Sequence, residues 1–418
     1  MSGFASDAMT RGLTEHASSR PIRTLLFSTL YPSSARPNHG IFVETRLREL
    51  LKSGQVETRV VAPVPWFPSR SARFGDWAKM ASTPAFEERN GLQVWHPRYA
   101  LPPKVGMNVA PWTLAWGARA TVAKLIRDGF DFDLIDAHYY YPDGVAAAML
   151  SRWFNKPFVV TARGTDLNLI PQHPWPRKLI AQTAGAASGS IGVCAALMDE
   201  LYKLGAEREK LHVMRNGVDL ERFVPLEKEA MRQKLALPQG TVLLSVGHLI
   251  ARKGHDIAID AVARLPQATL VIIGEGEERT RLQQQVARLG IAARVRFTGA
   301  IPNTHLASWY SAADALILAS SREGWANVLL ESMACGTPVV ASRIWGTPEV
   351  VQSDVAGRLV DARNGAAFAQ AIKALLEAAP QREAVRRYAE GFAWGQTTEA
   401  QIALFRDVLS HTNAGHVR

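Results

Sequence analysis

Residues 314–342 read DALILASSREGWANVLLESMACGTPVVAS, and this stretch decides how the rest of the chain is interpreted. Residues 315–319 form an apolar run of strand length, which ends at the polar residues 320–322. A helical pattern of apolar residues begins near Asn327, and Gly336 stands where such a helix would stop. The stretch therefore predicts a buried strand, a loop and a helix, which is the repeating unit of an open parallel sheet.

Two carboxylates accompany this unit, Glu323 on the loop and Glu331 in the first turns of the helix. In an open parallel sheet, ligands bind beside the carboxyl ends of the strands, where helix amino termini offer free N–H groups to anions. Carboxylates repel phosphate, so these side chains fit better as acceptors for hydroxyl groups. The pattern predicts a ligand that joins a polyol to a phosphate. The alternative is that each Glu only complements the helix dipole or aids solubility.

The string EGWANVLLESMACGTPVVAS begins at Glu323 and closely resembles the Glu-x7-Glu motif of the retaining glycosyltransferases of family 4. Glu323 and Glu331 occupy the two glutamate positions of that motif. The resemblance extends over about residues 22–410. It implies the GT-B fold, an α/β architecture in which two doubly wound Rossmann-like domains face a cleft and a C-terminal helix crosses back to the first domain.

Strands alternate with helices along the chain without a repeat period, which also predicts two doubly wound sheets. At 418 residues the chain is too long for one ordinary core. Pro225, Pro238 and Gly240 mark irregular chain around the segment RNGVDLERF, which resembles the interdomain linker of the family. The predicted units are a disordered arm (1–20), an acceptor-binding domain (21–223), a nucleotide-sugar-binding domain (224–394) and a crossover helix (395–418).

Two adjacent cations, Arg252 and Lys253, follow the strand predicted at residues 242–246 and precede Gly254 and a helix. This order predicts a clamp for a diphosphate. By resemblance, the pair matches the basic pair that the family places at the leaving group. Some family members use an arginine where this chain has His248, so the division of work between these positions stays open. The alternative is an ordinary pair of solvated cations.

The resemblance implies a nucleotide sugar as donor, with Glu331 accepting ribose hydroxyls and Glu323 accepting a sugar hydroxyl. Arg252 and Lys253 would then stabilise the charge that develops on the departing phosphate, a role that needs no metal or other cofactor. The segment after the strand predicted at residues 295–297 matches the wall of the nucleobase site. The further donor-binding residues expected are Gly324, Trp325, Ala326, Asn327, His248 and Ile301.

In the first half, Gly40, His138 and Asp166 are expected near the acceptor, and Arg163 is expected among the catalytic residues. Gly40 precedes a helix amino terminus, and His138 ends a predicted strand, where its side chain would face the cleft. Many family members have a histidine where Arg163 stands, followed here by Asp166. A guanidinium is permanently charged and cannot shuttle a proton, so Arg163 is expected to contribute to catalysis by charge and hydrogen bonding. For His138, a structural role is the alternative.

The net charge of +10 lies mainly in the first half. Residues 1–185 hold 22 Lys and Arg against 14 Asp and Glu, a net charge of +8, which leaves +2 for the rest. Aromatic and basic side chains mix in residues 64–80 and in the helix predicted at residues 114–127, as at a bilayer interface. An anionic membrane or lipid-linked partner is therefore expected, whereas nucleic acid is not, because no nucleic-acid-binding motif is present. The alternatives are a role of the charge in solubility and aromatics that pack on their own domain.

Several other classes of protein are disfavoured. No apolar run reaches the length of about 18 residues that a membrane helix needs, and the amino terminus lacks the apolar core of a secretory signal. Cys194 and Cys335 fall in different predicted domains, so a reducing cytoplasm is expected. Asp131 and Asp133 precede a strand and predict a solvated turn, not a metal site. The segment GEGEE lacks the third glycine of a dinucleotide fingerprint, where Arg279 stands.

The sequence thus predicts a retaining glycosyltransferase that moves a sugar from a nucleotide-diphosphate donor to a hydroxyl of a glycan or lipid-linked acceptor. The expected setting is bacterial cell-surface or exopolysaccharide synthesis in the cytoplasm, at the inner face of the plasma membrane. Retention by a covalent carboxylate intermediate and by front-face attack both stay open. The alternatives are an epimerase or phosphorylase of the same fold and a non-catalytic regulator that binds sugar nucleotides.

Overall fold

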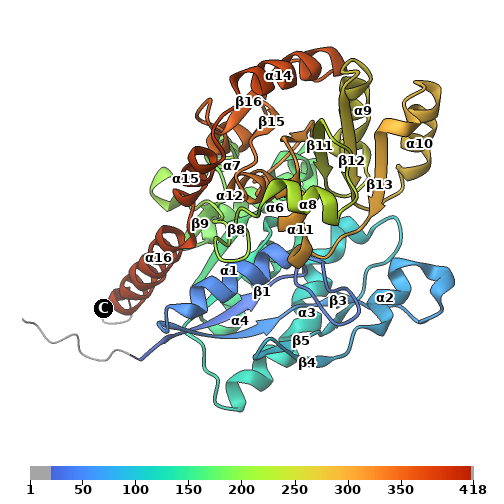
Figure 1. Ribbon diagram of the computed structural model, residues 1–418. Helices are drawn as coiled ribbons and strands as arrows, with labels where there is room; N and C mark the ends of the chain where they lie inside the picture. Colours follow the sequence, from blue (N-terminus) through green and yellow to red (C-terminus); the bar gives the residue numbers. More distant parts are fainter. Residues whose placement is uncertain (1–19, 416–418) are drawn as a thin grey trace, which may run out of the picture.

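The computed structural model describes residues 20–415, so the arm predicted at residues 1–20 lies outside the described part except for Arg20. Within that part, the strands form a sheet of eight strands, a sheet of six strands and one pair of two-residue strands. Figure 1 shows the two large sheets in separate halves of the molecule, the first half of the chain lying below the second. The expectation of two α/β domains is confirmed.

The first sheet has the order β10-β9-β8-β7-β1-β2-β5-β4 and is parallel except for the pair β4–β5. The order reverses between β1 and β7, and in doubly wound sheets ligands bind beyond the carboxyl ends of the strands at that point. The strands are β1 (Ile22–Phe27), β2 (Val56–Val61), β4 (Phe86–Arg89), β5 (Leu92–Trp95), β7 (Leu134–His138), β8 (Phe158–Ala162), β9 (Gly189–Gly192) and β10 (Leu211–Val213). The separate pair is β3 (Val64–Pro65) and β6 (Arg98–Tyr99).

Helices cover both faces of this sheet because its strands are apolar on both sides. Leu26 packs with Val43 of α1, whereas its neighbour Leu25 packs in the cluster that contains Leu114 of α3. Alternate residues of one strand thus enter two different cores. The helices are α1 (Ile41–Lys52), α2 (Asp76–Ser82), α3 (Gly106–Arg127), α4 (Val145–Phe154), α5 (Thr165–Asn168), α6 (Pro174–Ala186) and α7 (Ala195–Lys203).

The second sheet is wholly parallel, in the order β13-β12-β11-β14-β15-β16, and reverses between β11 and β14. Leu243 packs toward α9, α10 and α14, and Leu244 packs in the core on the other face, with α11 and α12. The strands are β11 (Thr241–Val246), β12 (Ala268–Ile273), β13 (Val295–Gly299), β14 (Ala315–Leu318), β15 (Val339–Ser342) and β16 (Gly357–Val360). The helices are α8 (Lys228–Lys234), α9 (His255–Ala263), α10 (Arg279–Arg288), α11 (Leu306–Ala312), α12 (Asn327–Ala334), α13 (Thr347–Val350), α14 (Gly365–Ala378) and α15 (Arg382–Glu390). The boundary placed between residues 223 and 224 stays a prediction.

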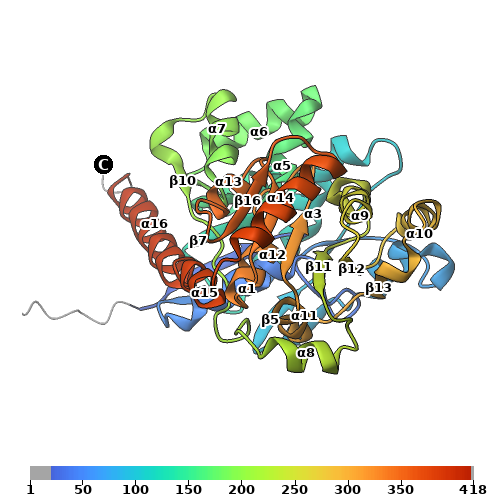
Figure 2. The same cartoon turned by 45° about the horizontal axis from the view of Figure 1, so that its top comes forward.

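The long helix α16 (Trp394–Gly415) leaves the second domain and runs beside the first, as Figures 1 and 2 show. Its buried residues Ile402, Phe405 and Val408 share one apolar cluster with residues of the first sheet, among them Leu134 and Val159. Burial of such side chains provides the main driving force for this docking. The expected crossover helix is confirmed, and with it the GT-B arrangement.

Two segments of the first domain differ from the prediction. Residues 64–80, expected as a loop, contain α2, and the ring of Phe67 packs at 5.2 Å from that of Phe74 and 5.4 Å from that of Trp77. The helix expected at residues 114–127 begins earlier, at Gly106, although Pro111 removes one backbone N–H inside it.

Pro111 is tolerated because of a contact from outside the helix. The carbonyl four residues earlier, that of Met107, accepts a hydrogen bond from the hydroxyl of Tyr141. A prolyl residue normally leaves that carbonyl unpaired. The helix therefore continues through a residue that would end it in a sequence-based prediction. Among residues 20–415, no helix combines the length and apolarity needed to cross a membrane.

Candidate functional site

The loops after β11 and β14 bring Glu323, Arg252 and Lys253 together. These two strands are parallel neighbours in the second sheet, so their carboxyl ends lie side by side. Lys253 Nζ donates to Glu323 Oε1 at 2.7 Å, and Arg252 Nη1 lies 3.5 Å from Glu323 Oε2. Three charged groups predicted from separate motifs thus form one cluster at the point where the strand order reverses.

Gly254 allows the two loops to approach each other. It has a φ of 70° and caps the start of α9. A Cβ at this position would lie 2.1 Å from the carbonyl oxygen of Ala319, just after β14. Any side chain would therefore push the loop that carries Arg252 and Lys253 away from the loop that carries Glu323.

The carboxylate of Glu323 is buried and stays ionised. Its residue is only 6% exposed, and Ser320 Oγ donates to Oε1 at 2.6 Å. Burial acts to raise the pKa of Glu323, but the charges of Lys253 and Arg252 and the hydrogen bonds outweigh it and hold the pKa below its usual range. Glu323 can therefore accept hydrogen bonds from hydroxyl groups over a wide range of pH.

This cluster faces a cavity of about 380 Å³ that both domains line. Leu30, Phe42 and Arg163 form part of the first-domain wall. The residues expected at the donor site that line the second-domain wall are His248, Arg252, Lys253, Glu323, Gly324, Trp325, Ala326 and Asn327. The cavity therefore combines cations, a carboxylate and loop backbone at the interdomain gap.

The two domains touch at Gly324. A Cβ on Gly324 would lie 2.1 Å from the carbonyl oxygen of Arg163 and 2.9 Å from the Cα of Gly164. The loop before α12 can approach the end of β8 this closely only because position 324 has no side chain. This contact closes one side of the cavity.

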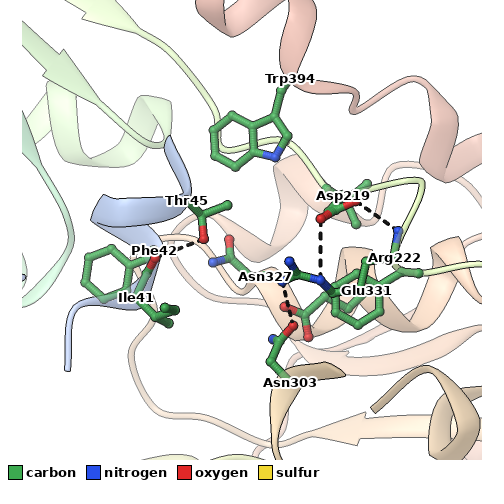
Figure 3. A pocket seen from close by; sticks show the side chains of 12 residues that line it. Ile41, Phe42, Thr45, Asp219, Arg222, Asn303, Asn327, Glu331 and Trp394 are labelled. Carbon is green, nitrogen blue, oxygen red and sulfur yellow. Dashed lines mark hydrogen bonds and ion pairs between the residues drawn. The ribbon is translucent and has the colours of Figure 1, made fainter. Parts of the chain in front are cut away.

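Glu331 lines a second cavity, of about 100 Å³, shown in Figure 3. The hydroxyl of Tyr310 donates to Glu331 Oε2 at 2.9 Å. Burial raises the pKa of Glu331 to about 7, although the hydrogen bond from Tyr310 and the charge of Arg222 oppose this shift. Phe42 and Asn327 line both cavities. The two glutamates therefore lie in adjoining compartments of one interdomain cleft.

Three polar residues of this cleft were not predicted as site residues. Asn216 accepts from Arg163 Nη1 at 3.2 Å and donates to Asn327 Oδ1 at 3.4 Å, so it connects the two domains. Arg222 Nη1 donates to Asn303 Oδ1 at 3.2 Å beside Glu331 (Figure 3). Asn216 and Arg222 lie in the segment RNGVDLERF, whose polar side chains were the available signal in the sequence. No local pattern marks Asn303.

The side chain of His138 does not face the cleft, so that expectation is wrong. His138 is 1% exposed, and Nε2 lies 3.2 Å from Asp136 Oδ2. Its Nδ1 accepts a hydrogen bond from Arg163 Nη2. The side chain at the end of β7 points into the protein because the pleat that places Ala137 on one face places His138 on the other. Arg163, the neighbour of His138, is the residue that reaches the cavity.

Gly40, Asp166 and Ile301 do not line either of these cavities. The carboxylate of Asp166 is fully buried and accepts the backbone N–H groups of residues 140, 163 and 164. A Cβ on Gly40 would lie 2.3 Å from the carbonyl oxygen of Leu30, so this glycine permits a close backbone contact. These observations give Asp166 and Gly40 clear structural tasks, and their contact with an acceptor stays a prediction.

Comparisons with known proteins identify the family of the chain. Residues 77–222 match the family described as Glycosyltransferase Family 4, and residues 227–392 match the family described as Glycosyl transferases group 1. A D-inositol 3-phosphate glycosyltransferase from Frankia alni is 32% identical over 327 residues, which cover 72% of this chain and 80% of the relative. The chain belongs to glycosyltransferase family 4.

Two solved structures share the fold of this glycosyltransferase. Sucrose-phosphate synthase from Thermosynechococcus elongatus has a TM-score of 0.78 at 21% identity, covering 94% of this chain and 100% of that one. HepE from Anabaena, solved in complex with UDP-glucose, has a TM-score of 0.67 at 22% identity, covering 91% and 98%. At these identities the likeness establishes the GT-B fold alone.

The acidic turn before β7 has a structural task in the glycosyltransferase. Asp133 accepts two hydrogen bonds from the guanidinium of Arg20 and one from the N–H of Arg23, whereas Asp131 is exposed. Asp133 therefore ties the start of β1 to the turn. The sequence had predicted a solvated side chain at this position, and that prediction is wrong for Asp133.

Among residues 20–415, no group of three His, Cys, Asp or Glu side chains is placed to hold a metal ion.

Proposed function

We propose that this glycosyltransferase moves a sugar from a nucleoside-diphosphate donor to a hydroxyl of a glycan or lipid-linked acceptor, with retention of configuration and without a metal or other cofactor. The observation that carries the proposal is the cluster of Glu323, Arg252 and Lys253 in a cavity between the domains. The complex of HepE with UDP-glucose supports a nucleotide sugar as donor.

Donor binding follows from the charges of the second domain. Arg252 and Lys253 would bind the diphosphate, and the ionised Glu323 between them would accept a hydroxyl of the sugar. Glu331, in the adjoining compartment, would accept the ribose hydroxyls. As the bond from sugar to phosphate breaks, negative charge grows on the phosphate, and fixed cations in a cavity of low dielectric stabilise that charge most.

The partners of Glu323 favour front-face attack over a covalent intermediate. One carboxylate oxygen is engaged by Lys253 at 2.7 Å and by Ser320 at 2.6 Å, and the other faces Arg252. A carboxylate neutralised in this way is a weak nucleophile. The acceptor hydroxyl would instead attack on the face from which the phosphate departs and give its proton to that phosphate. Arg163, from the first domain, would assist by charge.

The acceptor side has the composition of a membrane-binding surface. Trp116 of α3 is 60% exposed, and Trp175 of α6 is 45% exposed and stacks with Trp112 at 6.1 Å between ring centroids. Residues 98–127 contain five Lys and Arg and no Asp or Glu. Exposed indoles on a basic surface suit the headgroup layer of an anionic bilayer. We therefore place the enzyme in the cytoplasm, at the inner membrane face, in cell-surface or exopolysaccharide synthesis.

Thermal unfolding with a panel of UDP-, GDP- and ADP-sugars tests donor binding. A true donor at 100 times its Kd stabilises the protein by about 2.7 kcal/mol, which gives a clear rise in Tm. Replacing both Arg252 and Lys253 by Ala should abolish this rise. Lys373→Ala, an exposed cation on α14, serves as the matched control and should keep it. If the double variant responds as the wild type does, the proposed diphosphate clamp is wrong.

Sedimentation with vesicles tests the membrane surface. We expect the protein to sediment with vesicles that contain phosphatidylglycerol and to remain in solution with pure phosphatidylcholine. Replacing Trp116 and Trp175 together by Ala should reduce binding, whereas replacing Tyr202, an aromatic residue on α7 that is 47% exposed, by Ala should not. Equal sedimentation of all three proteins would remove α3 and α6 from the membrane proposal.

A further inference from the structure

A chain of buried polar side chains runs from the cleft to the crossover helix. Arg163 Nη2 donates to His138 Nδ1, and His138 Nε2 lies 3.2 Å from Asp136 Oδ2. The same Asp136 oxygen accepts from Gln401 Nε2 at 3.1 Å, and Gln401 Oε1 accepts from Arg46 Nε at 2.8 Å. One side chain of α16 is thus connected to the cleft through two residues of β7 and through Arg163, which directly follows β8.

The hydrogen bonds fix the tautomer of His138. A guanidinium has only donors, so His138 Nδ1 must accept and cannot carry a proton. The proton of the neutral ring therefore sits on Nε2, where it is donated to Asp136. Burial lowers the pKa of His138 to about 4, with the charges of Arg163 and Arg46 acting in the same direction and Asp136 opposing them, so the ring stays neutral near pH 7. A ring turned by 180° would place Cδ2–H opposite the guanidinium, and a C–H cannot accept its hydrogen bond.

The guanidinium of Arg163 depends on these neutral partners. Its side chain makes no ion pair with a carboxylate among the described residues, and its Nε is buried there without a hydrogen-bond acceptor. The side-chain acceptors recorded for it are Asn216 Oδ1 and His138 Nδ1. The orientation of Arg163 in the cleft therefore depends on the orientation of the His138 ring.

Gln401 completes the support because it separates two charges that would otherwise pair. Its amide donates to Asp136 with one end and accepts from Arg46 with the other. All three side chains are at most 2% exposed. Without the amide, Asp136 could turn toward Arg46, and the His138 ring would lose the acceptor that sets its tautomer.

We propose that Gln401 of the crossover helix is a positioning residue, which acts through Asp136 and His138 to hold the Arg163 guanidinium in the cleft. The inference rests on the proposed function, because it assigns α16 a task in the chemistry of that cleft. It extends that function, because a residue of α16, outside both sheets, would influence the turnover rate of the enzyme.

Kinetics of Gln401→Met test the proposal, with the panel nucleotide sugar that the wild type turns over as donor and release of its nucleoside diphosphate as the signal. We expect kcat to fall about 10-fold, the effect of losing one buried hydrogen bond, and the KM for the donor to change little. In the Arg163→Ala background the same substitution should cause no further fall. Gln396→Met, at an exposed position of α16, should behave as the wild type.

A merely structural role gives a different pattern. Val408→Ala weakens the packing of α16 without touching the polar chain, so it should lower Tm and leave kcat unchanged. If Gln401→Met lowers Tm but not kcat, or if its effect on kcat persists in the Arg163→Ala background, the proposal is wrong. Gln401→Asn, which keeps the amide but is one methylene shorter, provides a second variant if the Met variant does not fold.

The nitrogen-15 shifts of the His138 ring provide a readout that needs no turnover. The wild type should show protonated Nε2 and unprotonated Nδ1, and Gln401→Met should shift both signals. Unchanged signals, or a proton on Nδ1 of the wild type, would overturn the proposed support. A wild type that releases no nucleoside diphosphate from any sugar of the panel would count against the proposed function, and the ring shifts would then decide the inference.

Discussion

Replacing Glu331 by Gln should make the protein more stable at alkaline pH. The pKa of Glu331 is about 7, against an ordinary value of 4.5, because the carboxyl is buried. The folded chain therefore binds this proton more tightly than the unfolded chain does. The resulting stability is fully present below pH 4.5 and is lost as the pH rises through 7.

The shift sets an upper limit of about 3 kcal/mol for this loss, at 1.36 kcal/mol per pKa unit. Glutamine cannot ionise, yet its side-chain oxygen can still accept from the hydroxyl of Tyr310. At pH 8, Glu331→Gln should therefore unfold at higher urea concentration than the wild type, and the difference should vanish near pH 4.5. Asp143, whose pKa burial also raises to about 7, is present in both proteins and cancels in the comparison.

Urea unfolding followed by tryptophan fluorescence at pH 4.5, 6 and 8 measures this difference. Glu377→Gln, an exposed position on α14, should show no dependence of this kind. The stabilised Glu331→Gln protein should respond less to the donor, because a neutral amide is a weaker acceptor for ribose hydroxyls. A variant less stable than the wild type at pH 8, or a difference that is constant across the three pH values, would refute the reasoning.

Two further predictions concern the cleft. Glu323→Gln should lower the rate of nucleoside diphosphate release at least about 100-fold, because Lys253 loses its charged partner and the acceptor of the sugar hydroxyl loses its charge; a loss below 10-fold would contradict the role of Glu323. Gly324→Ala should lower both Tm and turnover, because the new Cβ would lie 2.1 Å from the carbonyl oxygen of Arg163. Gly185→Ala, where no atom lies within 4 Å of the new Cβ, is the matched control, and an equal effect of both changes would contradict the steric argument.

The second-domain half of the site could be predicted because its signals are local. The apolar run 315–319 predicts a strand. Gly254 precedes one predicted helix and Gly336 follows another, and the charged residues lie in the loops after the predicted strands. Parallel strands that are neighbours in the sheet then bring such loops together without further information. The structure accordingly groups Glu323 with Arg252 and Lys253.

The first-domain half could not be predicted in the same way. A strand-end position does not determine on which face His138 emerges, so its burial against Asp136 followed only from the structure. Pro111 ends a helix in any local prediction, and the Tyr141 hydroxyl that pairs with the carbonyl of Met107 is 34 positions away from it in sequence. Gln401 reaches the first domain through tertiary packing alone.

The position of α16 also bears on how the chain is made. A ribosome completes β1, β7 and β8 long before it completes the residues around Phe405 that cover one face of these strands. Until then, a nascent chain exposes Leu134 and Val159 to solvent or to a chaperone. We therefore expect the first half, expressed alone, to aggregate, and its rescue to require a separately supplied peptide that contains residues 394–415.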